Sequence, residues 1–145
     1  MPFVYQFNRL LKLNYDKQQM MESEYQQLYE QLEAVGQKLV DLLKRKEHIQ
    51  DKLSSELAER IPAGSIMDIQ QQLKHIDHLI ADIQNQYQQK KQALEAANQQ
   101  LVEQSQEVKK YEKHRHKQWL QYSEAEKKSD NRKMDETAQQ QFLRQ

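Results

Sequence analysis

The residues of this chain that could do chemistry are few, and its five histidines come first. His75 and His78 lie three residues apart, a spacing that puts two imidazoles on one helix face, where they can bind a metal. The sequence around them offers no clear third ligand, so we interpret both as solvent-facing side chains beside Ile76. His114 and His116 are two residues apart and point to different faces of a helix. We therefore expect no metal and no cofactor.

Groups for nucleophilic or phosphate chemistry are equally hard to find. The sequence has no cysteine, no glycine-rich phosphate loop and no Ser-His-Asp spacing. The lack of cysteine also excludes a disulfide, which suits a reducing cytoplasm. The sequence thus predicts a protein without enzymatic activity.

The densest charged segment is a basic run just before Trp119. It consists of Lys109, Lys110, Lys113, His114, Arg115 and Lys117. Basic residues beside an aromatic ring can bind nucleic acid, but a solvated helix face balanced by Glu107 and Glu112 is an alternative. A third interpretation is a basic collar that contacts an acidic protein surface. Because 22 basic residues match 22 acidic ones over the chain, we expect no nucleic-acid partner.

The composition indicates long helices. Of the 145 residues, 37% are hydrophobic and 30% are charged, with only two glycines and two prolines. This is typical of a coiled coil rather than of a globular core. Disorder is the competing interpretation, but the regular spacing of Leu, Ile, Val and Tyr argues against it. The sequence has no apolar run long enough for a membrane span and no signal-peptide core, so we expect a cytoplasmic or peripheral protein.

Two heptad repeats give this spacing. In the first, the a positions are Val4, Leu11, Gln18, Tyr25, Leu32, Leu39, Lys46 and Leu53, and the d positions are Phe7, Asn14, Met21, Leu28, Val35, Leu42 and Ile49. In the second, the a positions are Ile66, Leu73, Ile80, Tyr87, Leu94, Leu101 and Val108, and the d positions are Ile69, Ile76, Ile83, Lys90, Ala97, Gln104 and Tyr111. Each repeat predicts a helix that packs along a partner. Gly36 lies off the seam. It is interpreted either as a flexible point of the helix or as a tolerated surface glycine.

One break separates the two repeats. Pro62 cannot continue a helix, Gly64 permits a positive φ, and Ser65 is a good N-cap. We predict one all-α domain over residues 1–145, a long two-helix antiparallel coiled-coil hairpin with an extended C-terminal helix. Its first helix spans about 5–59, the turn 60–65 and the second helix about 66–141.

The register of the hairpin is left open between two solutions. Pairs whose residue numbers add up to 122 match Tyr25 with Ala97 and Gln18 with Gln104, large with small and polar with polar. A register one heptad away, adding up to 129, makes a tighter turn. In either register the second helix is longer, and we predict an unpaired arm from about residue 118. The apolar N-terminal segment, residues 1–13, is expected to pack on the returning helix.

The C-terminal part resembles a known family. Val108-Lys109-Lys110-Tyr111-Glu112-Lys113, Lys117-Gln118-Trp119 and Lys133-Met134-Asp135-Glu136-x-Ala138 are similar to the flagellar export protein family FliJ. Tyr5-Gln6-Phe7 with Leu10-Leu11-x-Leu13 resembles the start of this family, and Gly64 with Ile69-Gln70-Gln71 its middle. Leu73 departs from the pattern, because the family often has an aromatic residue near there.

This resemblance implies a function that the periodicity does not. It implies a non-enzymatic coiled coil, similar to the central stalk of rotary ATPases, that inserts into the hexameric ring of the export ATPase FliI. It further implies coupling to the export gate protein FlhA, an escort role for export chaperones and a need for the protein in flagellum biogenesis and motility. The implied location is the cytoplasmic face of the cell membrane at the flagellar base.

The resemblance also implies contact residues. The residues expected to bind the ATPase ring lie near the two termini: Phe3, Phe7, Leu10, Trp119, Tyr122, Met134, Asp135 and Phe142. Those expected to bind the gate lie nearer the turn: Leu42, Gln70 and Ile76. Leu42 and Ile76 are also seam positions, so packing between the helices is an alternative role for both.

Two alternative functions stay open at this point. A related secretion stalk of the injectisome type would share fold and mechanism. A plain coiled-coil scaffold, self-associating through its free arm, would be indifferent to any ATPase.

Overall fold

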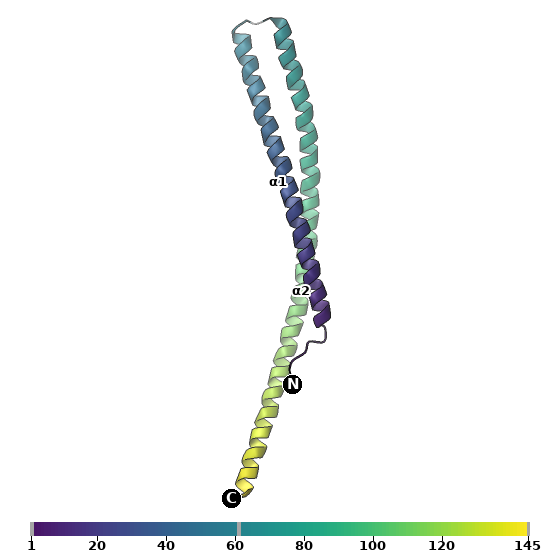
Figure 1. Cartoon of the computed structure of the whole chain (residues 1–145), viewed down its shortest axis with the longest axis vertical. Helices are drawn as coiled ribbons and strands as arrows, with labels where there is room; N and C mark the ends of the chain where they lie inside the picture. The colour runs from purple at the N-terminus through teal and green to yellow at the C-terminus, as the bar shows by residue number, and fades with distance from the viewer. Residues whose placement is uncertain (1, 61, 145) are drawn as a thin grey trace. The chain divides into compact units, whose positions relative to one another are not determined.

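The computed structural model describes residues 2–60 and 62–144, and these residues form an all-α hairpin. Helix α1 spans Asn8–Ala58 and helix α2 spans Ala63–Arg144 (Figure 1). No strand occurs in these two ranges. The predicted fold class is confirmed, although α1 begins three residues later and α2 ends three residues later than predicted. None of the described helices is long and apolar enough to cross a membrane.

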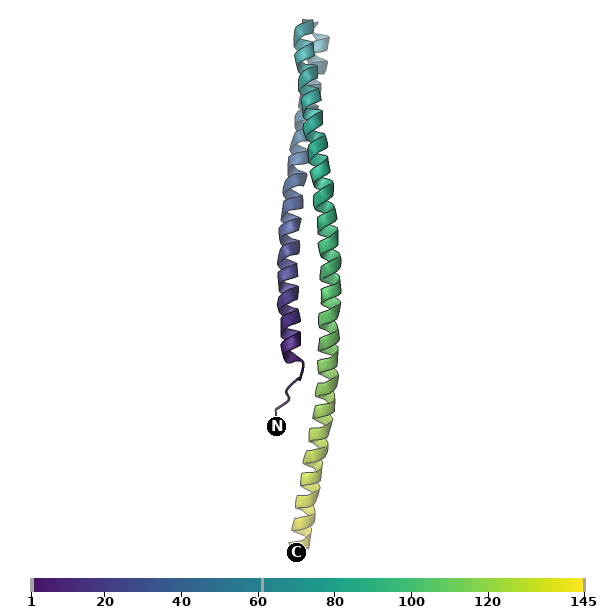
Figure 2. The same cartoon turned by 90° about the vertical axis from the view of Figure 1, so that its right-hand side faces the viewer.

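The contacts divide the chain into two compact units. Unit 1 combines Met1–Met20 with Val102–Gln145, and unit 2 is the continuous segment Met21–Leu101. In unit 2, α1 and α2 lie side by side up to the turn that joins them, in both views (Figures 1 and 2).

Unit 2 is held together by aliphatic side chains. Val35, Ile69, Ile76 and Ile80 are each at most 8% exposed, and every other heptad position of this unit is at least partly buried. Complete burial of one such side chain stabilises a fold by about 1.5–3 kcal/mol. The predicted seam is therefore the core of this unit.

Polar pairs across unit 2 identify its register. Lys46 Nζ lies 2.7 Å from Asp77 Oδ1, and Lys90 Nζ donates a hydrogen bond of 2.9 Å to Gln31 Oε1. Both pairs lie within one residue of the register whose paired numbers add up to 122. The alternative register, one heptad away, is wrong.

At the turn, the residue that bends the chain differs from the predicted one. Arg60, not Gly64, has the positive φ, at 56°, and a residue in this conformation commonly ends a helix. Gly64 and Ser65 both lie inside α2, so Ser65 is not its N-cap. Ser65 N instead donates to Pro62 O at 3.1 Å, which places Pro62 immediately before the first helical turn.

The seam of unit 1 is more polar. Gln104 is only 7% exposed, and its Nε2 donates to Asn14 O at 3.1 Å and to Asn14 Oδ1 at 3.0 Å. Gln18 Nε2 donates to Ser105 Oγ at 3.2 Å. The predicted Gln18–Gln104 pair is therefore wrong, because each glutamine bonds to a different polar partner on the facing helix. Leu11, 1% exposed, is the most buried apolar residue nearby.

Candidate protein-binding surface

Unit 1 begins with a non-helical segment, Pro2–Phe7, which we call the N-terminal strap. It ends where Asn8 N donates to Tyr5 O at 3.1 Å and Leu11 N donates to Phe7 O at 2.9 Å, which starts α1. An extended chain advances about 3.3 Å per residue, against 1.5 Å in a helix. The strap therefore reaches further along α2 than a continued helix would.

Aromatic contacts fasten the strap to α2. The rings of Phe3 and Tyr122 lie 5.4 Å apart, and Phe7 lies 5.7 Å from the ring of His114. Tyr5, 4% exposed, has its hydroxyl 2.7 Å from His114 Nδ1. Burial raises the pKa of the Tyr5 phenol, which keeps it neutral and able to donate this hydrogen bond. The prediction that the N-terminal segment packs on the returning helix is confirmed for these residues.

A further contact joins α1 to α2 next to the strap. The hydroxyl of Tyr15 donates a short hydrogen bond to Glu112 Oε1. This bond to the carboxylate is the largest cause that raises the pKa of Tyr15.

The Tyr122 hydroxyl donates to Glu126 Oε1 at 2.8 Å, within α2, and this bond likewise raises the pKa of Tyr122.

Beyond the strap, α2 has no cover in the described structure. Tyr122 and Ser123 are half-buried, but every residue of the range 124–144 is exposed. We call this range the C-terminal arm. It starts later than the predicted residue 118, because Gln118, Tyr122 and Ser123 are still half-buried and Phe3 of the strap contacts Tyr122. Figure 1 shows the arm as the yellow end of α2.

The arm is polar along its first half and apolar only near its end. Between Glu124 and Lys133 the only apolar residue is Ala125. Met134, Phe142 and Leu143 follow, at 70%, 77% and 81% exposure. Met134, Ala138 and Phe142 recur every four residues on one flank of the helix. We call these last three residues with Leu143 the arm tip.

The basic run is an exposed face of α2 beside the strap. Each of its six residues is exposed, and Lys110 lies 3.6 Å from Glu107. Arg115 lines a shallow hollow with Phe3, Glu112, His116 and Trp119. Trp119 is 46% exposed, and its ring stacks on His116 at 6.1 Å. This arrangement offers cations and an aromatic face together.

The structure brings together five of the predicted ring-binding residues. Phe3 contacts Tyr122 and borders the hollow that contains Trp119. Phe7 and Leu10 line a second hollow, with Tyr111 and His114. The other three, Met134, Asp135 and Phe142, are exposed on the arm.

The predicted gate-binding residues have different environments. Ile76 is 3% exposed and belongs to the core of unit 2, and Leu42 is half-buried in the same seam. Gln70 is exposed. Burial thus favours the packing role for Leu42 and Ile76 and leaves Gln70 accessible to a partner.

Sequence reasoning missed the contacts of Tyr5 and His114. The strap is not helical, so no heptad spacing predicts which residues of α2 it contacts. His75 and His78 are exposed, and within residues 2–60 and 62–144 no cluster of three His, Cys, Asp or Glu side chains could hold a metal.

Comparison with known proteins assigns this arrangement to a family. The model of the family described as flagellar FliJ protein matches residues 3–145, including strap, hairpin and arm. The chain belongs to the FliJ family. The flagellar FliJ protein of Bacillus subtilis (strain 168) is 28% identical over 143 residues, which cover 99% of this chain and 97% of that relative. No solved structure matches. FliJ membership makes this a flagellar protein and confirms the family resemblance.

Proposed function

We propose that this FliJ-family protein is a non-enzymatic stalk of the flagellar export apparatus, whose C-terminal arm and strap enter the ring of the export ATPase FliI. The observation that carries the proposal is the exposure of α2 from 124 to 144. In this role the chain promotes assembly and activity of the ring.

Physical chemistry supports a partner for the arm. Most helical stability in proteins comes from packing of an apolar face, and every residue from 124 to 133 is exposed. Docking of the arm tip in an apolar pocket would bury Met134 and Phe142, which are 70% and 77% exposed. Burial of each such side chain is worth about 1.5–3 kcal/mol. Such a partner would stabilise the arm as a helix.

The basic run supports an orienting role beside the arm. Exposed cations set the approach and register of a partner more than its final affinity. Lys109, Lys113 and Arg115 would contact an acidic rim, while Trp119 would supply an apolar anchor.

The same proposal gives the turn half of unit 2 to the export gate FlhA. The exposure of Gln70 supports this contact. Ile76 is buried in the core of unit 2, so it would act only by holding in place the helix that carries Gln70. Export chaperones are further candidate partners, and the chain would act at the cytoplasmic face of the membrane at the flagellar base. Family membership favours this flagellar role over the injectisome alternative.

The test is the ATPase rate and oligomeric state of the cognate FliI with full-length protein and with a chain ending at Ser123. We expect the full chain to promote hexamers and raise turnover, and the shortened chain to do neither while keeping its hairpin by circular dichroism. The double change Met134→Ser with Phe142→Ser should reproduce most of the loss. A matched double change of exposed polar residues, Asn131→Ser with Gln140→Ser, should not.

Equal stimulation by the shortened chain would contradict the proposal. Indifference of the ATPase to every version would favour the plain scaffold hypothesis instead.

A further inference from the structure

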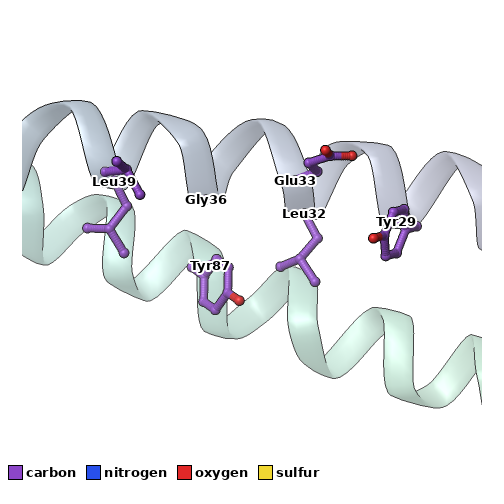
Figure 3. A pocket seen from close by; sticks show the side chains of 7 residues that line it. Tyr29, Leu32, Glu33, Gly36, Leu39 and Tyr87 are labelled. Carbon is purple, nitrogen blue, oxygen red and sulfur yellow. The ribbon is translucent and has the colours of Figure 1, made fainter.

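The apolar side chains of the arm differ from those of unit 2 in what they contact. In unit 2, Tyr87 of α2 packs against α1 at Gly36, so the hairpin itself uses this ring (Figure 3). On the arm, Met134 and Phe142 are 70% and 77% exposed. Side chains this exposed have little packing of their own, so the side of the arm that carries them is open to a partner.

Leu120, just before the arm, shows which side of α2 is turned away from the strap. Tyr122 faces the strap, because its ring lies 5.4 Å from that of Phe3. Successive side chains of a helix are turned by about 100°, so Leu120, two residues earlier, lies on nearly the opposite side. Leu120 is accordingly 46% exposed.

This outward side of α2 continues to the end of the arm as a row of side chains. Leu120 and Ala138 are eighteen residues apart, which is about five full helical turns. Steps of three and four residues give the other members of the row. We call it the outer row, and all its members are exposed: Lys113, Lys117, Leu120, Glu124, Lys127, Asn131, Met134, Ala138 and Phe142.

The outer row has two parts of different chemistry. Its first part, residues 113–127, contains three lysines and a single carboxylate, Glu124. Its second part, residues 134–142, is apolar, and the neutral Asn131 separates the two. A surface with this order of charged and apolar groups is complementary to an acidic surface that is followed by an apolar pocket.

The opposite side of the arm has no such pattern. The heptad positions that continue the seam of unit 1 past Tyr122 are Ala125, Ser129, Arg132, Glu136, Gln139 and Leu143. Between the first and the last of them every residue is polar, and the two charged ones have opposite signs. A helix that extended the seam along the arm would find too few apolar contacts there. The apolar groups of the arm therefore favour a partner on the outer side, not a continuation of the coiled coil.

We propose that a partner contacts the arm along the outer row alone, with an acidic surface facing residues 113–127 and an apolar pocket that takes Met134, Ala138 and Phe142. This inference rests on the proposed function, in which the partner is the ring of the export ATPase. It adds which side of the arm the ring contacts and the chemistry of the surface that the ring presents. The charges select such a surface, because lysines buried against an apolar wall would lose their hydration without compensation.

Single cysteines can report each side of the arm, because the chain has no cysteine of its own. Ala138→Cys lies in the outer row and Glu136→Cys on the opposite side, at the same level of the arm, and both positions are exposed in the free chain. Peptide mass spectrometry measures how fast a polar maleimide labels each full-length variant, alone and with the cognate FliI ring. Co-sedimentation checks that both variants still bind the ring.

The ring should protect only one of these two thiols. With the ring at about ten times its dissociation constant, labelling of A138C should slow about tenfold and labelling of E136C by less than about twofold. Equal slowing at both positions, or slowing at E136C alone, would overturn the one-sided contact and leave entry of the arm into the ring in place. Labelling unchanged by the ring at both positions would overturn this inference and the proposed function together.

Two charge variants test the acidic partner surface. K117E with K127E reverses two charges of the outer row, and R132E with K133E reverses two charges outside it, with the same change in net charge. The first variant should weaken binding to the ring about tenfold at low salt, because each reversal replaces an attraction by a repulsion. The second should weaken binding by less than about twofold, and high salt should remove most of the difference.

Equal weakening by the two charge variants would show that only net charge matters and would overturn the acidic surface opposite the outer row. Binding that K117E with K127E leaves unchanged would overturn it too. Circular dichroism checks that both variants keep the hairpin.

Discussion

The two units use the same heptad repeat for different purposes. In unit 2 the seam is mainly aliphatic, with Ile69, Ile76 and Ile80 nearly inaccessible to water. In unit 1 the seam passes through Asn14 and Gln104, which hydrogen-bond across it, and an aromatic strap completes the packing. A buried hydrogen bond contributes less net stability than an aliphatic side chain of similar size and requires one geometry. Unit 2 is thus built for stability, and unit 1 for defined positioning beside an exposed arm.

The largest effect should come from the aliphatic seam. Ile76→Ala should lower the free energy of unfolding by about 3 kcal/mol, because it removes buried methyl groups and leaves a cavity. Denaturant titration measures the loss, and hydrogen exchange should show it mainly in residues 21–101. The exposed change Gln72→Ala is the control and should stay within about 0.5 kcal/mol of wild type. A comparably small loss for Ile76→Ala would contradict the aliphatic core.

The next effect should come from the polar seam of unit 1. Gln104→Ala should cost about 1–3 kcal/mol, because the carbonyl and the side-chain oxygen of Asn14 lose a buried donor. Local exchange rates around Asn14 and Ser105 would report this loss. Gln106→Ala, at a neighbouring exposed position, should change little. If both variants behaved alike, the hydrogen bonds of Gln104 would not be what holds this segment.

A gain in stability is expected at Gly36 of α1. Gly36→Ala should raise stability by up to about 1 kcal/mol in dilute solution, because alanine favours the helix and its Cβ has room beside Tyr87. Thermal melts of the variant and of the wild-type chain measure this gain. A melting temperature that falls would show that the hairpin itself needs glycine here.

The smallest effect concerns pH. The pKa of Tyr15 is raised chiefly by its hydrogen bond to Glu112, so the folded chain favours the neutral phenol. The stability that this hydrogen bond adds to the folded chain is complete below the usual tyrosine pKa of about 10. It is lost as the pH rises through the raised pKa of Tyr15. Because Tyr15 is 39% exposed, water screens the pair, and we expect at most about 0.5 kcal/mol. Tyr15→Phe should flatten this loss between about pH 9 and 11; an unchanged pH profile would exclude the bond as its cause.

The periodic parts of the fold could be predicted from the sequence. The heptad positions from Leu11 to Leu53 and from Ile66 to Tyr111 all lie in the buried or half-buried seam, because helical period alone decides which side chains share a face. Matching those faces favoured the observed register but left a register one heptad away open, and only the polar pairs of the structure decided between them. The sequence did not predict which individual residues pair, since Gln18 and Gln104 each have a different polar partner on the facing helix.

The non-periodic parts could not be predicted in the same way. At the turn, Arg60 rather than Gly64 adopts the positive φ, because helix α2 begins early enough to include the glycine. The strap packs through Tyr5 on His114 and through Phe3 on Tyr122, contacts between segments more than a hundred residues apart. At Leu42 and Ile76 a docking residue and a seam residue have the same sequence pattern, and only burial separates the two roles.

The most direct test of the account is hydrogen exchange of the full chain, alone and with the cognate FliI ring. If the arm is the part that enters the partner, residues 124–144 should exchange rapidly in the free chain, because all of them are exposed. The ring should then slow exchange in the arm and the strap and leave residues 21–101 unchanged. Protection confined to residues 21–101, with an arm that exchanges equally fast in both states, would contradict the assignment of unit 1 as the working end.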